Sequence, residues 1–566
     1  MGEPRFPHEN ICVLLSYMRI TLDIIQKELP ETSEEDKSPW NVHTIQSYNP
    51  LYTNFTTLTE DNYKSSCLNL KYFMANPTQI YSTQFPEDKI TAPLFVKSAP
   101  LIDPIHFLIG KYKDEQHKKT ALPQLTSTTE TCMEKILNKH NASYVDCFFN
   151  YLSSETLHKM NNSNGIDFYG SYLAVQKKFC FNAYDDIEYL QDSSYFLENN
   201  NKLYELDNDS TLQQGSGNGN SQQKRPKLNI QDEIIALEDS IDICDNDEDT
   251  PIEETNDLEV VFDETQIDKD DSSDSDDNSE VCYSSEDEEA REDESDEEDE
   301  SGEDESEEDE EDDSETSEEE LLPLYIYDFP VQMIALEKCD GTFDQQLESE
   351  ELEEKEVASA LIQVIFTLML YQDTFEFTHN DLHTNNILYK KTNVTHLYYE
   401  HNKQLYKVPT FGRIYKIIDF GRAIFTYNGQ RYCSDSFAPK GDAHGQYNTE
   451  PYLNDDKARI EPNYSFDLCR LGCSMYDFVL DSDEPLPKKM TPMQKVVHSW
   501  CLDDNGMNVL YKKNGEERYP NFKLYKMIAR LVHKSRPHDQ LKNPFFSQFI
   551  CKGRKPKNVS IIGKSL

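Results

Sequence analysis

The feature that most constrains the fold is a strongly acidic segment in the middle of the chain. Residues 231–320 include 48 acidic side chains, and their only basic side chains are Lys269 and Arg291. Such a segment repels itself and has too little apolar surface to offset the entropy of ordering it. We therefore expect a disordered insertion over residues 206–321. The folded part must then be assembled from the sequence on either side of it.

The acidic segment also accounts for most of the formal net charge of −53, and without it the chain carries only about −7. The folded part is thus mildly acidic. Three roles for the segment are open: a solvated spacer, which is the commonest role of such charge runs, a surface that attracts basic partner proteins, or a flap over a basic cleft.

An apolar run and two polar motifs follow the acidic segment. Residues 357–371 (VASALIQVIFTLMLY) predict a buried helix, shorter than the roughly 20 residues that a membrane span needs. Residues 378–388 (THNDLHTNNIL) and 416–422 (KIIDFGR) come next. They contain His-x-Asp-x-x-x-x-Asn and Asp-Phe-Gly, in that order.

These motifs supply the groups that phosphoryl transfer requires. The reaction needs an oriented acceptor hydroxyl and neutralised phosphate charge more than covalent help from the protein. Asp381 is expected to face the hydroxyl, and His379 to brace its loop from behind. Asn386 and Asp419 offer the hard oxygen ligands that Mg²⁺ prefers. The alternative is an ordinary polar loop and a turn tripeptide, which the presence of both motifs makes the weaker interpretation.

With the helix before them, the motifs resemble those of eukaryotic-type protein kinases, and more narrowly the serine/threonine kinase-like proteins of large nucleocytoplasmic DNA viruses. The resemblance implies an α+β, bilobal protein kinase-like fold, interrupted here by the acidic insertion. It implies a serine/threonine protein kinase that transfers the γ-phosphate of ATP to protein hydroxyls. The cofactors would be ATP and Mg²⁺, with Mn²⁺ as an alternative metal.

Two further segments extend the resemblance. Residues 333–344 (MIALEKCDGTFD) are similar to the kinase hinge, where backbone groups near Glu337 and Cys339 would hold adenine. Residues 465–475 (SFDLCRLGCSM) are similar to the helix whose aspartate, here Asp467, would hydrogen-bond the backbone of the catalytic loop.

Near the end of the chain, residues 536–546 (RPHDQLKNPFF) resemble the segment that closes many kinase domains. Its Arg536 would pair with a buried glutamate. We favour Glu450 for that partner, because Glu461 is too close in sequence to Asp467.

The amino-terminal half matches the family less closely. Lys97, within residues 93–112, resembles the strand lysine that grips the α- and β-phosphates. A helix over residues 144–157 would supply its partner acid, for which we choose Asp146 over Glu155. A solvated acid on the helix face is an equally good interpretation of Asp146. No Gly-x-Gly-x-x-Gly loop precedes Lys97, so backbone N–H groups cannot approach the phosphates as closely.

Two positions in the first motif depart from the commonest kinase pattern. Asn380 replaces an arginine that reads a phosphorylated activation loop, so activation by loop phosphorylation is not expected. His383 replaces a lysine that contacts the γ-phosphate. We assign His383 to the catalytic residues and expect a neighbouring phosphate to favour its protonated form.

Two other functions are compatible with this pattern. A small-molecule phosphotransferase of the same fold also carries Asp-Leu-His, but the segments around Asp467 and Arg536 favour a protein substrate. A catalytically weak kinase-like scaffold would explain the missing glycine loop. The four residues that transfer requires argue against a scaffold, because all are present: Lys97, Asp381, Asn386 and Asp419.

We expect an amino-terminal extension or lobe start (1–90), the amino-terminal lobe (91–205), the acidic insertion (206–321), the end of that lobe with the hinge (322–350), the carboxyl-terminal lobe (351–550) and a basic tail (551–566). Residues 393–416 carry interleaved aromatic and basic side chains. They predict an inserted β-hairpin with a Pro-Thr-Phe-Gly turn rather than a nucleic-acid surface.

The expected partners are protein substrates, with basic proteins drawn to the acidic segment, and neither a membrane nor nucleic acid. No secretory signal is evident. By the resemblance we expect an intracellular protein of the host-cell cytoplasm. The nucleus is an alternative because of the basic residues at 224–227 (KRPK), and the virion is another.

Overall fold

The structure is a computed structural model. It describes residues 40–55, 57–63, 68, 72–76, 79–82, 89–184, 186–206, 322–349, 352–480, 486–512 and 515–563. The described residues form a mixed α and β fold, which agrees with the α+β class that the sequence predicted. The predicted acidic insertion lies outside the described residues except for Leu206, and so does the basic stretch at 224–227.

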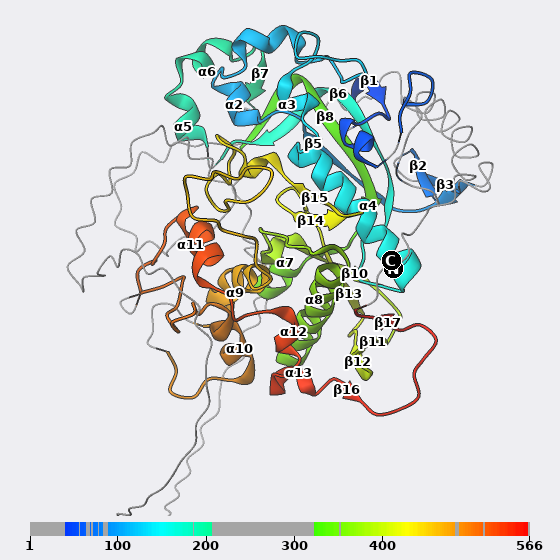
Figure 1. The fold of residues 1–566 in the computed structure, drawn as a ribbon, viewed down its shortest axis with the longest axis vertical. Helices are drawn as coiled ribbons and strands as arrows, with labels where there is room; N and C mark the ends of the chain where they lie inside the picture. Colours follow the sequence, from blue (N-terminus) through cyan, green and yellow to red (C-terminus); the bar gives the residue numbers. More distant parts are fainter. Residues whose placement is uncertain are drawn as a thin grey trace, which may run out of the picture. The chain divides into compact units, whose positions relative to one another are not determined.

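An antiparallel sheet is built from both sides of the acidic insertion (Figure 1). Its strand order is β1-β6-β8-β5, and β7 also pairs with β8. The two longest strands, β6 before the insertion and β8 after it, pair from Phe168 opposite Leu336 to Asn182 opposite Pro323. The five strands are β1 (Val42–Gln46), β5 (Leu94–Pro100), β6 (Phe168–Asn182), β7 (Tyr204–Leu206) and β8 (Pro323–Glu337).

Helix α4 (Ala142–Met160) packs on β6 and β8. The Asn141 side chain caps its first turn by accepting the Ser143 N–H, and Asn161 ends it with a φ of 57°. The helix expected over residues 144–157 is therefore confirmed and slightly longer. Twelve of its 19 residues are buried, because the sheet covers one side of the helix and the helical part of the fold covers another.

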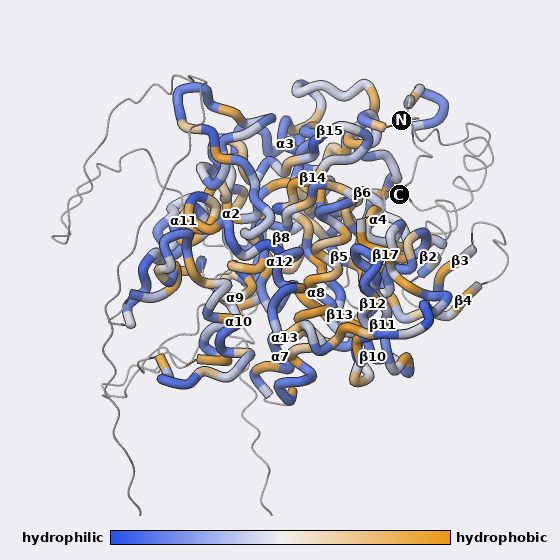
Figure 2. The backbone as a smooth tube through the Cα atoms, turned by 60° about the horizontal axis from the view of Figure 1, so that its bottom comes forward, coloured by the Kyte–Doolittle hydropathy of each residue, from blue (hydrophilic) through white to orange (hydrophobic). Residues whose placement is uncertain are grey.

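The predicted core helix is α8 (Glu354–Phe375), which begins with a capping box between Glu353 and Glu356. Its 22 residues are long and apolar enough to cross a membrane, so the expectation that it is too short was wrong. In the structure 89% of its most apolar window is buried inside the protein. Figure 2 shows α8 as an apolar stretch among the other helices and strands, as is typical of a core helix.

The remaining described elements are short. The helices are α2 (Pro104–Leu108), α3 (Glu134–Leu137), α5 (Ile187–Gln191), α6 (Ser194–Asn199), α7 (Phe343–Glu348), α9 (Phe466–Val479), α10 (Pro492–Trp500), α11 (Lys523–Leu531), α12 (Pro537–Gln540) and α13 (Pro544–Ser547), with 3₁₀ turns η1 (Pro50–Asn54), η3 (Lys113–Lys118), η4 (Thr384–Asn386) and η5 (Asp435–Phe437). The strands are β2 (Tyr72–Asn76), β3 (Gln79–Ser82), β4 (Lys89–Thr91), β9 (Gly341–Thr342), β10 (Ile387–Lys391), β11 (His396–His401), β12 (Gln404–Pro409), β13 (Arg413–Ile417), β14 (Ile424–Tyr427), β15 (Gln430–Cys433), β16 (Ile550–Cys551) and β17 (Ser560–Ile561).

The expected hairpin in residues 393–416 is present as β11 and β12. Its turn lies at Asn402 and Lys403, which both have positive φ, and the Pro-Thr-Phe-Gly segment instead connects β12 to β13. The described part of the predicted tail, residues 551–563, is part of the fold, because β16 pairs with β12 and β17 pairs with β11.

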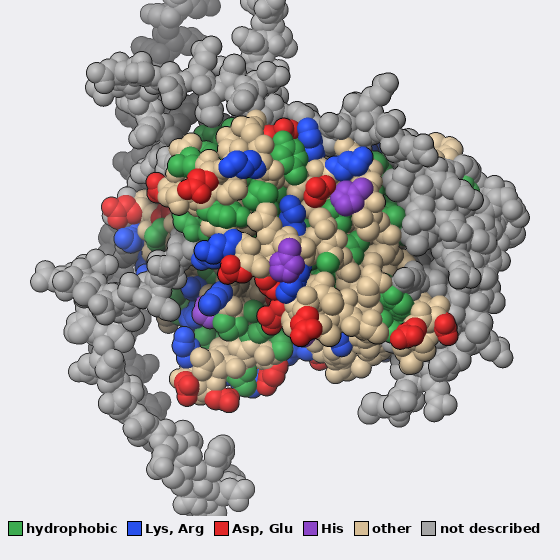
Figure 3. All heavy atoms as spheres, turned by 90° about the horizontal axis from the view of Figure 1, so that it is seen from above, with side chains coloured by type: hydrophobic (Ala, Val, Ile, Leu, Met, Phe, Trp, Pro, Cys, Tyr) green, Lys and Arg blue, Asp and Glu red, His purple; other side chains and the backbone are tan. Residues whose placement is uncertain are grey.

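The face of the molecule seen in Figure 3 carries basic, acidic and apolar side chains in an interspersed arrangement. Such a surface is what a folded part with a formal charge of only about −7 leads us to expect.

Aromatic side chains join α4 to the helical part of the fold. The Phe149 ring stacks on Phe377 with centroids 4.2 Å apart and lies 4.7 Å from Phe420. It also meets Tyr371 and Phe375 of α8 edge-on. One side chain thus connects three segments that are far apart in the sequence.

We expect Phe149→Ala to lower the free energy of unfolding by about 3–5 kcal/mol, because Phe149 is fully buried and its loss leaves a cavity between α4 and α8. Chemical denaturation followed by circular dichroism measures the change. Phe95→Ala is the matched control, since the Phe95 side chain is 52% exposed and should change stability by less than about 0.5 kcal/mol. Equal effects of the two substitutions would contradict this account of the core.

Candidate functional site

Lys97 lies between two carboxylates that come from distant parts of the chain. Its Nζ is 2.8 Å from Asp146 Oδ2 and 2.9 Å from Asp419 Oδ1. Lys97 belongs to β5, Asp146 to α4, and Asp419 to the loop after β13. The pairing of Lys97 with Asp146 that the sequence analysis expected is therefore present, and Asp419 joins it.

Asp146 is a buried hydrogen-bond acceptor. Its side chain is only 2% exposed, so the interpretation of Asp146 as a solvated surface acid was wrong. Besides Lys97, it accepts the Phe420 N–H at 2.8 Å and an Asn150 Nδ2 hydrogen at 2.9 Å. Glu155, the alternative acid, pairs instead with Lys159 on the same helix. Asp146 thus ties α4 to the backbone of the Asp-Phe-Gly loop.

The charges of the three residues depend on one another. Burial opposes the charge of Lys97, but Asp146 and Asp419 hold its pKa above the ordinary value. Burial raises the pKa of Asp146. Burial also acts to raise the pKa of Asp419, but the Lys97 ammonium more than offsets this and lowers that pKa to about 2. Asp419 is therefore an anion at neutral pH.

The loop of the first motif is held through its backbone by Asp467, at the start of α9. Its carboxylate accepts the N–H groups of His379, at 2.9 and 3.1 Å, and of Asn380, at 2.9 Å. His379 Nε2 is 2.8 Å from the Ile418 carbonyl oxygen. The roles expected of His379 and Asp467 as supports of this loop agree with these contacts.

Asn380 has a φ of 66°, a left-handed conformation that asparagine tolerates better than most residues. Its side chain donates to the Arg422 carbonyl at 2.8 Å and accepts from the Tyr447 hydroxyl at 2.7 Å. Asn380 is thus held by buried hydrogen bonds to uncharged groups.

The Asp381 carboxylate is held on both oxygens. Tyr525 donates its hydroxyl proton to Oδ1 at 2.6 Å, and Arg422 Nη1 donates to Oδ2 at 3.3 Å. Burial raises the pKa of Asp381, but Arg422 offsets burial and holds the pKa below its ordinary value. Neither partner was predicted from the sequence. The place of Arg422, directly after Asp-Phe-Gly, was a usable signal, whereas nothing in the sequence marked Tyr525.

Asn386 and His383 lie beside Asp381. One Asn386 Nδ2 hydrogen bonds the Asp381 carbonyl at 2.9 Å, and His383 Nε2 is 3.0 Å from the same nitrogen. An amide nitrogen only donates, so His383 Nε2 accepts and the imidazole is neutral. Burial lowers the pKa of His383 to about 4. The expectation that a neighbouring phosphate favours protonated His383 stays a prediction.

Two oxygens at the site are suited to a divalent cation. In the part of the chain that the structure describes, Asn386 Oδ1 and Asp419 Oδ2 accept no hydrogen bond, and the Asp419 side chain is 46% exposed. No group of three or more His, Cys, Asp or Glu side chains among the described residues forms a metal cage. The residues fit Mg²⁺, which usually takes only one or two protein ligands and shares phosphate oxygens.

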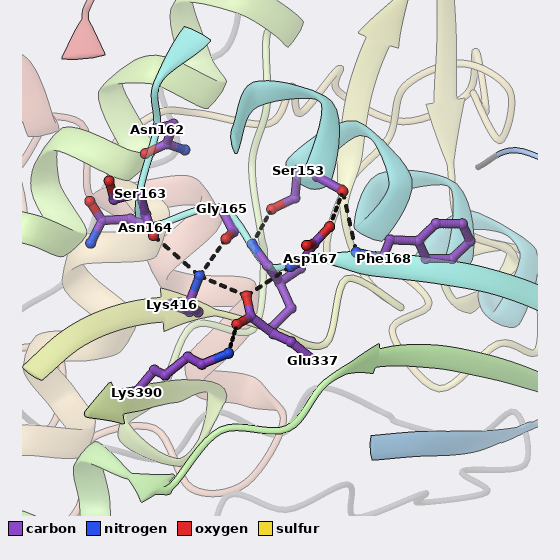
Figure 4. Close-up of polar contacts among 12 residues, drawn as sticks. Ser153, Asn162, Ser163, Asn164, Gly165, Asp167, Phe168, Glu337, Lys390 and Lys416 are labelled. Atoms are coloured by element: carbon purple, nitrogen blue, oxygen red, sulfur yellow. Dashed lines mark hydrogen bonds and ion pairs between the residues drawn. The ribbon is translucent and has the colours of Figure 1, made fainter. Parts of the chain in front are cut away.

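The Glu337 side chain points towards Lys416 and Lys390 (Figure 4). Its carboxylate binds Lys390, Lys416 Nζ at 2.8 Å and the Asp167 N–H at 2.9 Å. Its own N–H donates to the Asp167 carbonyl at 2.9 Å. The Glu337 N–H is therefore already paired, and the expectation that backbone groups near Glu337 and Cys339 hold adenine stays a prediction. Cys339 is half-buried, and its N–H has no partner among the described residues.

The expected pairing of Arg536 with a buried glutamate was also wrong. Arg536 is exposed, and its guanidinium carbon lies 5.3 Å from the centroid of the Tyr464 ring. Glu450 and Glu461 both pair with Arg459, which is closer to them in sequence and lies on the same exposed loop.

No protein-family model and no curated protein matches this chain. Its function therefore has to be inferred from the arrangement of these side chains.

We expect Glu337→Gln to lower the free energy of unfolding by about 3 kcal/mol at pH 7, because Lys416 would remain buried without its anion. Burial raises the pKa of Glu337, but Lys416 and Lys390 more than offset it and lower that pKa. The stabilisation is therefore present above the ordinary pKa of about 4.3 and is lost as pH falls through the folded-state pKa.

Urea denaturation at pH 7 and at about pH 3.5 tests this. The difference in free energy of unfolding between the native chain and Glu337→Gln should be smaller at the acidic pH. Glu450→Gln, which removes one partner of an exposed ion pair, is the control and should change little at either pH. A difference that stays constant with pH would rule out an ionised Glu337.

Proposed function

We propose that this chain is an ATP-dependent serine/threonine protein kinase with a bilobal protein kinase-like fold. The observation that carries the proposal is the ion triad of Lys97, Asp146 and Asp419. Asp146 also accepts the Phe420 N–H, and the Asn386 side chain donates to the Asp381 carbonyl. Phosphoryl transfer to a hydroxyl requires a phosphate-binding cation, metal-binding oxygens and an acceptor-facing carboxylate. Lys97 on β5 would be the cation, and Asp381 and Asp419 lie on loops whose backbone N–H groups are bonded by buried carboxylates.

The arrangement of the elements supports the same proposal. The small lobe would be the sheet with α4, and the large lobe would contain α7 to α13 with their short sheets. Residues 338–342 connect the end of β8 to α7 and would form the hinge. The Cys339 N–H on this connection, which has no partner among the described residues, is suited to an adenine nitrogen. Glu337, by contrast, would support the hinge from its far side.

In the proposed reaction, Lys97 binds phosphate oxygens of ATP, and Asn386 Oδ1 and Asp419 hold Mg²⁺. When bound there, the metal would supply positive charge next to the phosphate oxygens. Asp381 orients the acceptor hydroxyl and takes its proton as the new oxygen–phosphorus bond forms. The bond from the γ-phosphorus to the bridging oxygen breaks, and ADP leaves. His383 contributes a neutral hydrogen-bond acceptor that fixes the Asn386 amide.

Two alternatives are kept. A kinase-like scaffold is favoured by one observation: β5, which carries Lys97, is the last strand at its edge of the sheet, and no described strand pairs with its second edge. A small-molecule phosphotransferase would have the same Lys97, Asp381 and Asp419. The phosphate acceptor distinguishes these functions. A scaffold phosphorylates no acceptor, and a small-molecule enzyme does not phosphorylate protein hydroxyls.

We expect the native chain to transfer phosphate from γ-labelled ATP with Mg²⁺ to serine or threonine in a panel of basic and acidic proteins. Asp381→Asn should lower the rate at least about 100-fold, because it removes the proton acceptor but keeps the shape. Asp539→Asn, at an exposed ion pair with Lys542, is the matched control and should leave the rate unchanged. If the native chain binds ATP but phosphorylates no protein in the panel, the protein kinase proposal fails.

The metal ligands give an independent prediction. Chelation with EDTA should abolish transfer by the native chain, and excess Mg²⁺ should restore it. Asp419→Asn should reduce the rate about 100-fold or more without recovery at high Mg²⁺, because a neutral amide is a poorer ligand and a poorer partner for Lys97. Calorimetric titration of ADP with Mg²⁺ measures the binding component. Undiminished transfer in EDTA would exclude the metal site.

A further inference from the structure

Tyr525 makes the shortest described contact to the Asp381 side chain. Its hydroxyl is 2.6 Å from Asp381 Oδ1 and 2.9 Å from Arg470 Nε. An arginine nitrogen can only donate, so the phenol oxygen must accept from Arg470. The single phenol proton is then directed to Asp381. The direction of both hydrogen bonds follows from the chemistry of the groups alone.

The Tyr525 ring is held rigidly. It is 1% exposed and stacks on Phe522 with centroids 5.2 Å apart. The guanidinium carbons of Arg470 and Arg422 lie 5.2 and 5.6 Å from its centroid. Because the phenol cannot rotate out of this packing without breaking several contacts, its hydroxyl has a fixed position next to Asp381.

Arg470 is costly to bury. It belongs to α9, is 2% exposed, and its Nη1 has no hydrogen-bond partner in the described part of the molecule. Burial of a guanidinium with an unsatisfied nitrogen costs stability unless interactions with nearby anions and hydrogen-bond acceptors offset it. The nearby anion is the Asp381 carboxylate, which Arg470 reaches through the Tyr525 hydroxyl. The Arg470 charge can stabilise this anion.

The contact with Tyr525 leaves room for an acceptor. Each carboxylate oxygen has two lone pairs, and Tyr525 and Arg422 each use one on a different oxygen of Asp381. The Asp381 side chain is 15% exposed. An acceptor hydroxyl can therefore reach Asp381 while Tyr525 stays in place.

We propose that Tyr525, backed by Arg470, is a positioning residue that fixes the orientation of the Asp381 carboxylate towards the acceptor hydroxyl. The inference rests on the proposed kinase function. Among the described hydrogen bonds, Tyr525 makes none to Asn386 or Asp419, the proposed metal ligands. Its effect should therefore fall on the transfer step and not on ATP binding. The proton removed from the acceptor goes to Asp381, and the phenol keeps its own.

The test compares Tyr525→Phe with the native full-length chain in steady-state phosphate transfer. Tyr525→Phe should lower kcat about 10- to 100-fold and leave the KM for ATP within about twofold, because a small loss of orientation slows transfer without touching nucleotide contacts. The temperature midpoint of unfolding is measured alongside. Tyr399→Phe is the matched control. It removes another buried phenol hydroxyl, which donates to Asn164 Oδ1 at 2.6 Å and has no described hydrogen bond to Asp381.

Arg470→Lys is the second variant. It keeps a buried cation but loses the Nε hydrogen bond to Tyr525, so an intermediate fall in kcat with unchanged KM for ATP is expected. If Tyr525→Phe does not fold, the kcat of Arg470→Lys tests the positioning role instead.

The outcomes separate the two proposals. If the native chain transfers phosphate, Asp381→Asn does not, and Tyr525→Phe matches the Tyr399→Phe control, the positioning role is overturned and the kinase function stands. A rise in kcat in Tyr525→Phe would also overturn it, because Tyr525 would then block the acceptor. If the native chain transfers no phosphate at all, the proposed function fails and the role of Tyr525 fails with it.

Discussion

The pairing of β6 with β8 is the constraint on which the rest of the structure depends. These strands come from opposite sides of the acidic insertion, and β8 also pairs with β5, which carries Lys97. Lys97 lies opposite Ile334, three positions before the end of β8 at Glu337. Because side chains alternate between the faces of a sheet, a shift of one residue in this register would turn Lys97 away from Asp146 and Asp419.

The position of α4 is determined by two kinds of interaction that reinforce each other. Phe149 packs against Phe377 and Phe420, and Asp146, about one turn earlier, accepts the Phe420 N–H. The apolar contact and the hydrogen bond therefore hold the same loop at the same point. An aspartate has a shorter side chain than a glutamate, so α4 must lie close to Lys97 for the ion pair to form. The aromatic packing draws it there.

The sequence predicted the elements whose signals are local. Asp467 was assigned to the loop backbone, and Asp146 to Lys97, from short motifs and the helix pattern around them. Both contacts are in the structure. The errors concern partners that only tertiary packing brings together. Glu450 and Arg536 were paired by analogy, but Arg459 is the nearer cation to Glu450. Tyr525 reaches Asp381 from a helix that carried no motif, so no spacing rule could have found it.

The ion cluster around Glu337 has a mechanical consequence. Its carboxylate contacts Asp167 at the start of β6 and two lysines on β10 and β13, so it lies where the sheet and the helical part of the fold meet. Ion pairs to lysine tolerate small changes in angle better than planar arginine pairs do. If the sheet rocked relative to the helices about this cluster, Cys339, two residues along, would move less than Lys97, which lies opposite Ile334 farther along the sheet.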